Sequence, residues 1–262
     1  MNRLKQTISK LLSHAGIRVS LIKKRGKETL GHYVDVRFPP LYKKYCDESM
    51  VAWQGMHDAF DAAAYITESN IEGDVVECGV WRGGVSGLMK DVVYANEGSS
   101  ERKFWLFDTF EGMTAPSKSD FRSGEDQEQT LNTHKQSLRA DGTSDWCRGD
   151  LPDVKKTISK SSGGLDNVKF IKGKVEDTLR LNNVPSKIAL LRLDTDFYES
   201  TKVELEVLLP KLATGGILII DDYGAWAGAR KAFNEMKEEK GLKDFAVFRN
   251  HIDGALIAIK TS

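Results

Sequence analysis

The sequence lacks an excess of either charge and has few cysteines. Its 262 residues carry 38 Lys and Arg against 38 Asp and Glu, so the formal net charge is zero. No overall electrostatic attraction to nucleic acid is therefore expected. Cys46, Cys78 and Cys147 are an odd number at wide spacings, which gives neither a disulfide framework nor a zinc motif. We therefore expect a reduced, cytoplasmic setting.

Long apolar segments are also missing. No apolar run approaches the roughly 18 residues that indicate a membrane span. The basic N-terminus has Lys and Ser among its apolar residues, so it lacks the core of a signal peptide. Internal repeats and low-complexity segments are absent as well. The length fits one large α/β domain or two small ones, with enough chain to bury a substantial core.

The charge is unevenly distributed, because residues 1–27 carry eight Lys or Arg and no acid. Leu4, Ile8 and Leu11 recur there at helical spacing, which predicts a basic amphipathic helix. Two interpretations are open. The helix either packs on its own domain or a second subunit, as in a homo-oligomer, or it contacts a membrane surface or anionic partner. We treat residues 1–50 as a basic arm and residues 51–262 as the main domain.

Short apolar runs alternate with amphipathic stretches from residue 50 onward. Strands are predicted at 74–80, 103–108, 168–173, 188–194, 216–222, 244–250 and 255–260, and the clearest helices at 56–69, 84–96 and 200–212. This alternation favours a mostly parallel sheet covered by helices on both faces. The last two strands are joined by a few residues, so they must be antiparallel. The predicted fold is α/β, a seven-stranded doubly wound sheet with a reversed final strand.

Residues 109–165 show no strand–helix rhythm and contain several prolines and glycines. A connection of this length inside a compact domain is usually functional or disordered. We expect a lid or substrate-binding insertion.

The segment "VECGVWRGGVS" (76–86) places an acid at a strand end and glycines at the start of a helix. Glycines let a ligand approach the backbone, and the helix N-terminus offers free N–H groups. The glycine order differs from the dinucleotide fingerprint. Glu77 would repel a pyrophosphate but attract the cationic amino group of S-adenosylmethionine. The candidate cofactor-binding residues are Glu77, Gly79, Trp81, Gly83 and Ser86; a plain tight turn is the alternative.

Acidic residues also follow the second and third predicted strands. Asp108 ends "FWLFD" and is predicted, with the adjacent Thr109, to bind the ribose of an adenosine cofactor. Helix capping is the alternative. Glu176 and Asp177 stand at a predicted helix start after the third strand. They are predicted to contact the adenine or the substrate, with capping and pairing with the helix dipole as the alternative.

Three carboxylates follow the fourth and fifth strands. Asp194, Asp221 and Asp222 are predicted to converge on one hard-oxygen site that suits Mg²⁺. Successive side chains of an extended strand face opposite ways, so the strand must break at Asp221 for both aspartates to bind one ion. Asp196 is the predicted general base. His134 is the rival base, because its ordinary pKa is nearer neutral; an exposed histidine with no such role is the alternative.

Together these motifs resemble the macrocin O-methyltransferase family. The resemblance covers about residues 50–260 and rests on "GDVVECGVWRGG", "LFDTFEGM", "EDTL", "LLRLDTDFYEST" and "PKLATGGILIIDDYGAWAGARKAF" in this order. It implies a class I methyltransferase (Rossmann-like) fold that uses S-adenosylmethionine and Mg²⁺. It also implies cofactor roles for Glu77, Gly79, Ser86 and Asp108, metal ligation by Asp194, Asp221 and Asp222, and a base role for Asp196.

The sequence departs from the family's motifs at two positions. Thr195 replaces the glycine of a Leu-Asp-Gly-Asp motif, and Lys174 replaces the tryptophan of Gly-Trp-Phe-x-Asp-Thr-Leu. The family's histidine base aligns near Gly142, several residues from His134. The Lys174 change and the basic arm suggest that the acceptor is not a macrolide.

The expected function is therefore transfer of a methyl group from S-adenosylmethionine to a Mg²⁺-chelated hydroxyl. The acceptor is expected to be a sugar of a glycosylated natural product or of a surface polysaccharide. The alternatives are a catechol-type O-methyltransferase and a noncatalytic cofactor-binding subunit. An NAD-dependent dehydrogenase is disfavoured by the glycine spacing.

Overall fold

The computed structural model describes residues 35–98, 101–181, 183–249 and 254–262. The chain divides into two units, Met1–Val36 and Arg37–Ser262, and the features below belong to the second. The predicted basic helix within residues 1–27 lies outside the described residues. No helix in the described part of the chain is long and apolar enough to cross a membrane.

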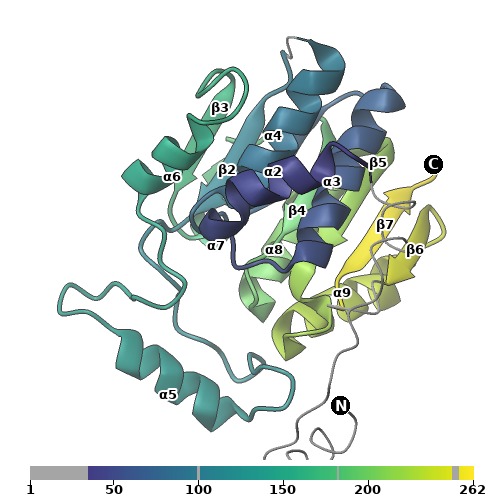
Figure 1. Ribbon diagram of the computed structural model, residues 1–262. Coiled ribbons are helices and arrows are strands. Elements are labelled where there is room, and N and C mark those ends of the chain that lie inside the picture. Colours follow the sequence, from purple (N-terminus) through teal and green to yellow (C-terminus); the bar gives the residue numbers. More distant parts are fainter. Residues whose placement is uncertain (1–34, 99–100, 182, 250–253) are drawn as a thin grey trace, which may run out of the picture. The chain divides into compact units, whose positions relative to one another are not determined.

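A seven-stranded sheet forms the centre of the described domain (Figure 1). Its strands are β1 (Asp74–Cys78), β2 (Phe104–Asp108), β3 (Val168–Lys172), β4 (Ile188–Leu193), β5 (Leu212–Ile220), β6 (Phe245–Arg249) and β7 (Leu256–Lys260). Their order is β3-β2-β1-β4-β5-β7-β6; β7 pairs antiparallel with β5 and β6, and the other neighbouring strands pair in parallel. The predicted sheet with a reversed final strand is confirmed. The strand order reverses between β1 and β4, where ligands of such sheets bind.

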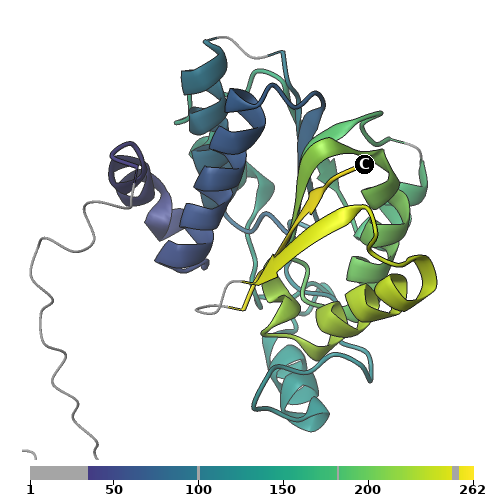
Figure 2. The same ribbon diagram turned by 90° about the vertical axis from the view of Figure 1, so that its right-hand side faces the viewer.

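Helices cover both faces of the sheet (Figure 2). They are α2 (Phe38–Tyr45), α3 (Trp53–Glu68), α4 (Gly84–Glu97), α5 (Gln127–Ser137), α6 (Leu151–Ile158), α7 (Val175–Thr178), α8 (Tyr198–Val207) and α9 (Ala227–Lys240), with 3₁₀ turns η1 (Cys46–Glu48), η2 (Leu179–Leu181), η3 (Leu209–Lys211) and η4 (Asp221–Tyr223). Helices α3 and α4 pack together on one face, and α8 and α9 on the other. The middle strands are buried on both sides, which explains their continuous apolar runs.

The predicted helix 200–212 is wrong at its C-terminal end. Helix α8 stops at Val207, and Pro210 falls in the following turn η3. Proline lacks an N–H group and its ring clashes with the carbonyl group one turn earlier, so it ends the helix. Strand β5 then begins at Leu212, four residues before the predicted strand.

Residues 109–165 are more regular than the sequence indicates, because they contain α5 and α6. Helix α5 begins with a capping box between Asp126 and Gln129. The sequence of α5 is mostly polar, so apolar periodicity does not indicate a helix there. Helix α6 places Val154 and Ile158 against Gly83 at the start of α4, so it belongs to the layered fold. In contrast, α5 lies beyond the edge of the sheet in both views (Figures 1 and 2).

Candidate active site

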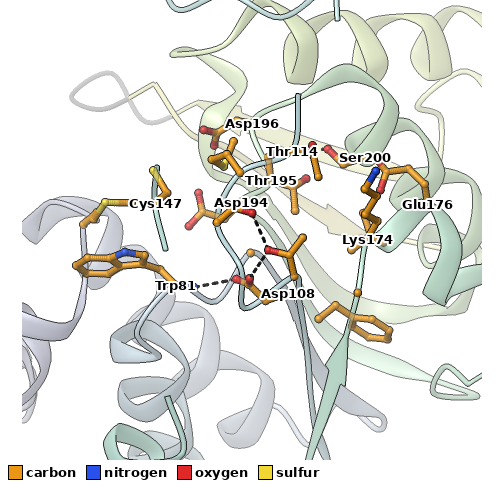
Figure 3. A pocket seen from close by; sticks show the side chains of 18 residues that line it. Trp81, Asp108, Thr114, Cys147, Lys174, Glu176, Asp194, Thr195, Asp196 and Ser200 are labelled. Atoms are coloured by element: carbon orange, nitrogen blue, oxygen red, sulfur yellow. Dashed lines mark hydrogen bonds between the residues drawn. The ribbon is translucent and has the colours of Figure 1, made fainter. Parts of the chain in front are cut away.

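Acidic side chains gather at the carboxyl ends of the middle strands. Asp108 ends β2, Asp194 follows β4, and Asp221 and Asp222 follow β5. A cavity of about 700 Å³, counting its open mouth, lies at this edge of the sheet. Asp108, Asp194 and Asp196 line it together with the turn after β1 (Figure 3).

The turn between β1 and α4 approaches the loop after β4 very closely. Gly79 has φ 82°, and a Cβ atom there would stand 1.9 Å from the carbonyl oxygen of Asp194, so only glycine fits. Gly79 and Trp81 line the cavity, and their contact with a cofactor stays a prediction. Gly83 (φ 85°) starts α4 and packs against α6 instead. It does not line the cavity, and its predicted contact with a cofactor stays a prediction.

Asp108 holds this turn in place. Its Oδ2 atom accepts hydrogen bonds from the N–H groups of Val80 (2.7 Å) and Trp81 (3.0 Å), and its Oδ1 atom accepts one from Phe110 (2.7 Å). Burial raises the pKa of Asp108, and these hydrogen bonds partly offset the effect. Thr109 lines the cavity beside it. Asp108 thus shapes the turn, and its contact with a ribose stays a prediction.

Glu77 and Ser86 lie behind the cavity wall. Each is 1% exposed, and the Ser86 hydroxyl donates a hydrogen bond to the Glu77 carboxylate. Arg192 of β4 donates a second one over 2.7 Å. Burial raises the pKa of Glu77, while Arg192 lowers it. Because these two partners already occupy the carboxylate, binding of a cationic amino group by Glu77 stays a prediction.

Arg192 is the central cation of the site, and the sequence analysis missed it. Its buried guanidinium group forms ion pairs with Glu77 (2.7 Å), Asp194 (2.8 Å) and Asp221 (2.7 Å). A side chain with five donors in a rigid fork suits several carboxylates at once. The signal was present in "IALLRLD", where an arginine interrupts an otherwise apolar buried strand.

Asp194, Asp221 and Asp222 form the predicted metal-binding cluster. One carboxylate oxygen from each lies within 4.8 Å of those of the other two. Strand β5 ends at Ile220 and η4 follows, so the strand breaks where both aspartates need it to break. Burial and neighbouring carboxylates raise the pKa of Asp194 and Asp222. The buried Oδ2 atom of Asp222 has no hydrogen-bond partner, and a bound cation would satisfy it.

Asp196 lies beside this cluster and lines the cavity. The backbone is not extended there, since φ is 66°, so the side chain reaches the cavity through a left-handed turn. The Asp196 carbonyl oxygen accepts a hydrogen bond from the N–H group of Ala229 over 3.2 Å. Burial raises the pKa of Asp196 to about 7. That value suits proton transfer near neutral pH, and the base role stays a prediction.

His134 lies on α5 with only 8% of its surface exposed, so it is not an exposed histidine. Its ring centroid is 6.4 Å from that of Trp146, and it does not line the cavity. Burial lowers its pKa. A base role for His134 gains no support from this placement.

The acids after β3 occupy different environments. Glu176 lines the cavity with Lys174, whereas Asp177 is exposed at the first turn of α7 and does not line it. Of this pair, Glu176 is therefore the candidate for contact with a cofactor.

Aromatic side chains anchor the insertion to the site. The ring of Trp146 lies 6.0 Å from those of Phe197, after β4, and Trp226, after β5. A β-bridge joins Arg122 to Trp226. The insertion therefore packs directly on the two loops that carry the carboxylates.

Comparison with known proteins agrees with this geometry. A family model described as macrocin-O-methyltransferase (TylF) matches residues 43–258. The chain belongs to the macrocin O-methyltransferase family. The resemblance found in the sequence is thereby confirmed.

Two characterised O-methyltransferases are similar to this chain in sequence. An 8-demethyl-8-(2,3-dimethoxy-α-L-rhamnosyl)-tetracenomycin-C 4′-O-methyltransferase from Streptomyces olivaceus is 36% identical over 68% of this chain and 63% of its own length. A demethyldecarbamoylnovobiocin O-methyltransferase from Streptomyces niveus is 30% identical over 67% and 62%. The chain thus spans a little over three fifths of the length of these relatives.

A solved structure confirms the fold. The O-methyltransferase NovP superposes with a TM-score of 0.67 at 24% identity, covering 82% of this chain and 83% of NovP. The class I methyltransferase fold predicted from the sequence is therefore correct.

Proposed function

We propose that this protein is an S-adenosylmethionine-dependent O-methyltransferase that uses Mg²⁺ and acts on a sugar hydroxyl. The observation that carries the proposal is the convergence of Asp194, Asp221 and Asp222 beside a cavity lined by the β1–α4 turn. The relatives in this family supply the substrate class, since one is named for a rhamnosyl 4′-O-methyltransferase activity. The sugar is proposed as part of a glycosylated natural product or surface polysaccharide.

Each group of residues has a separate task in this proposal. The β1–α4 turn, Asp108 and Glu176 hold S-adenosylmethionine, and Asp194, Asp221 and Asp222 hold the cation. When bound, Mg²⁺ supplies Lewis acidity that makes a hydroxyl group easier to deprotonate. Asp196 would accept that proton, and the cavity wall would position the hydroxyl oxygen toward the methyl group, whose bond to sulfur breaks as the bond to oxygen forms. Alignment of the reacting atoms is expected to supply much of the rate.

A binding assay tests the proposal directly. Calorimetry with S-adenosylmethionine, NAD and Mg²⁺ is expected to show binding of the first and third only. Mass spectrometry of reactions with sugar and catechol acceptors then identifies the methylated product. Tight NAD binding with no response to S-adenosylmethionine would contradict the methyltransferase assignment, and a methylated catechol alone would contradict the sugar.

Asp108→Asn is expected to weaken S-adenosylmethionine binding about tenfold. An amide group cannot accept all three backbone hydrogen bonds that Asp108 now accepts, and an unpaired buried donor costs about 1–3 kcal/mol. Calorimetric titration with the cofactor measures the change. The matched control is Asp166→Asn, because Asp166 is exposed and does not line the cavity. Equal affinities in the two variants would show that Asp108 does not shape the cofactor turn.

We also propose that residues 109–165 contribute an acceptor-binding lid. Trp146→Ala is expected to raise KM for the acceptor about tenfold or more, because it removes the ring that packs on Phe197 and Trp226. The affinity for S-adenosylmethionine is expected to change little. Steady-state kinetics and cofactor titration separate the two effects. An unchanged KM would exclude the lid role for this part of the insertion.

A further inference from the structure

A completely buried acid, Glu204, lies in α8 beneath the loop that carries Asp194 and Asp196. Its exposed fraction is 0%. The Thr195 hydroxyl oxygen lies 3.0 Å from its Oε1 atom and 3.2 Å from its Oε2 atom. Through this contact with Thr195, Glu204 connects helix α8 to the loop between Asp194 and Asp196.

Burial of the Glu204 carboxyl group does not favour folding by itself. Burial raises its pKa well above the ordinary value, which favours the protonated form. No ion pair to Glu204 occurs in the described ranges of the chain. An apolar side chain of similar volume at such a position is often neutral or stabilising. The carboxyl group is therefore better explained by what it bonds to than by packing.

Its partner Thr195 is the middle residue of the loop between a predicted metal ligand and the predicted base. Asp196 holds the left-handed conformation with φ 66°, which residues with a Cβ atom rarely adopt. The Thr195 carbonyl oxygen accepts a hydrogen bond from the N–H group of Phe197 over 2.7 Å. The side-chain bond from Thr195 to Glu204 is therefore a further constraint on this loop, directly before the residue that holds the rare conformation.

We propose that Glu204 is a positioning residue, which acts through Thr195 to fix the Asp194–Asp196 loop. In this arrangement Asp194 faces the cation and Asp196 faces the acceptor hydroxyl. This inference rests on the proposed function, in which Asp194 binds a cation. It assigns to the fully buried carboxyl group of α8 a role in setting cation affinity.

Binding of Mn²⁺ to the full-length protein, followed by electron paramagnetic resonance of the free ion, tests the role. Glu204→Leu and Thr195→Val are each expected to weaken Mn²⁺ binding about tenfold, as for other groups that orient metal ligands. The double variant is expected to be no weaker than the weaker single variant, because both changes break one contact. Glu204→Gln and Thr195→Ser keep a hydrogen-bonding group and are expected to remain close to the wild type.

Controls separate positioning from stability. Glu206→Leu makes the same change at an exposed position of α8 and is expected to leave Mn²⁺ affinity unchanged. Thermal unfolding checks that each variant is folded, and Thr195→Val tests the contact from the loop side should Glu204→Leu fail to fold. Wild-type affinity in Thr195→Val, or losses that add in the double variant, would overturn the role. No Mn²⁺ binding by the wild type would contradict the proposed metal site itself, and this role with it.

Discussion

Asp221→Asn is expected to lower Mg²⁺-dependent methyl transfer by about 100-fold or more, because it removes one of the three carboxylates proposed to bind the cation. The amide oxygen of asparagine can still accept the hydrogen bond that Arg192 donates to Oδ1 over 2.7 Å. The loss is therefore expected in cation binding, with little change in the fold. Initial rates across a Mg²⁺ titration, with calorimetric Mg²⁺ binding in parallel, measure both quantities.

Asp153→Asn is the matched control for this experiment. Asp153 is exposed on α6, and the same change of charge there is expected to leave Mg²⁺ dependence intact. Thermal unfolding of both variants checks that the fold is retained. Full activity of the wild-type enzyme in excess EDTA would rule out a required divalent cation, and with it the assigned role of Asp221.

Arg192→Met is expected to destabilise the protein by about 3–5 kcal/mol, since it leaves the buried Glu77 carboxylate without its ion-pair partner. For a domain of this size the melting temperature falls by on the order of 10 °C. The change also frees Asp194 and Asp221 from their ion pairs with Arg192. Chemical denaturation in EDTA measures the stability without a contribution from bound cations.

The destabilisation is expected to depend on pH. Burial raises the pKa of Glu77 and Arg192 is the largest opposing cause, so Arg192→Met raises the folded-state pKa further. A group whose pKa is higher in the folded state favours folding when protonated, and this advantage is lost as pH rises through the folded-state pKa. The loss in free energy of unfolding caused by Arg192→Met is therefore expected to be larger at pH 8 than at pH 5.5.

Arg180→Met is the matched control, because it removes the same charge at an exposed position in η2. It is expected to change stability by less than about 0.5 kcal/mol at either pH, as is usual for surface substitutions. A loss of stability in Arg192→Met that stays constant between the two pH values would contradict the view that Arg192 lowers the pKa of Glu77.

The sheet and the metal cluster were accessible from sequence because each depends on local pattern. Continuous apolar runs indicate buried parallel strands, and acids directly after such runs must fall at the carboxyl edge of the sheet. Asp194 and the Asp221–Asp222 pair could therefore be placed together without knowing any side-chain contact. Helix α5 was missed because its capping signal, Asp126 with Gln129, precedes a segment with little apolar periodicity.

Pairings between distant residues followed from the tertiary structure alone. Arg192 and Glu77 are 115 positions apart, and they meet because β4 lies beside β1. Glu204 meets Thr195 because α8 packs beneath the loop after β4. Neither partner is specified by spacing or residue type in the sequence.

By itself the sequence determined the seven-stranded fold, the edge that carries the site and the family to which the chain belongs. These follow from periodicity and short motifs, which act over a few residues. Only the tertiary structure decided which charges neutralise the buried carboxylates and how the loop from Asp194 to Asp196 is held. The physical reason is that a buried charge is stabilised by groups within a few ångströms in space, and folding brings these groups together from distant parts of the chain.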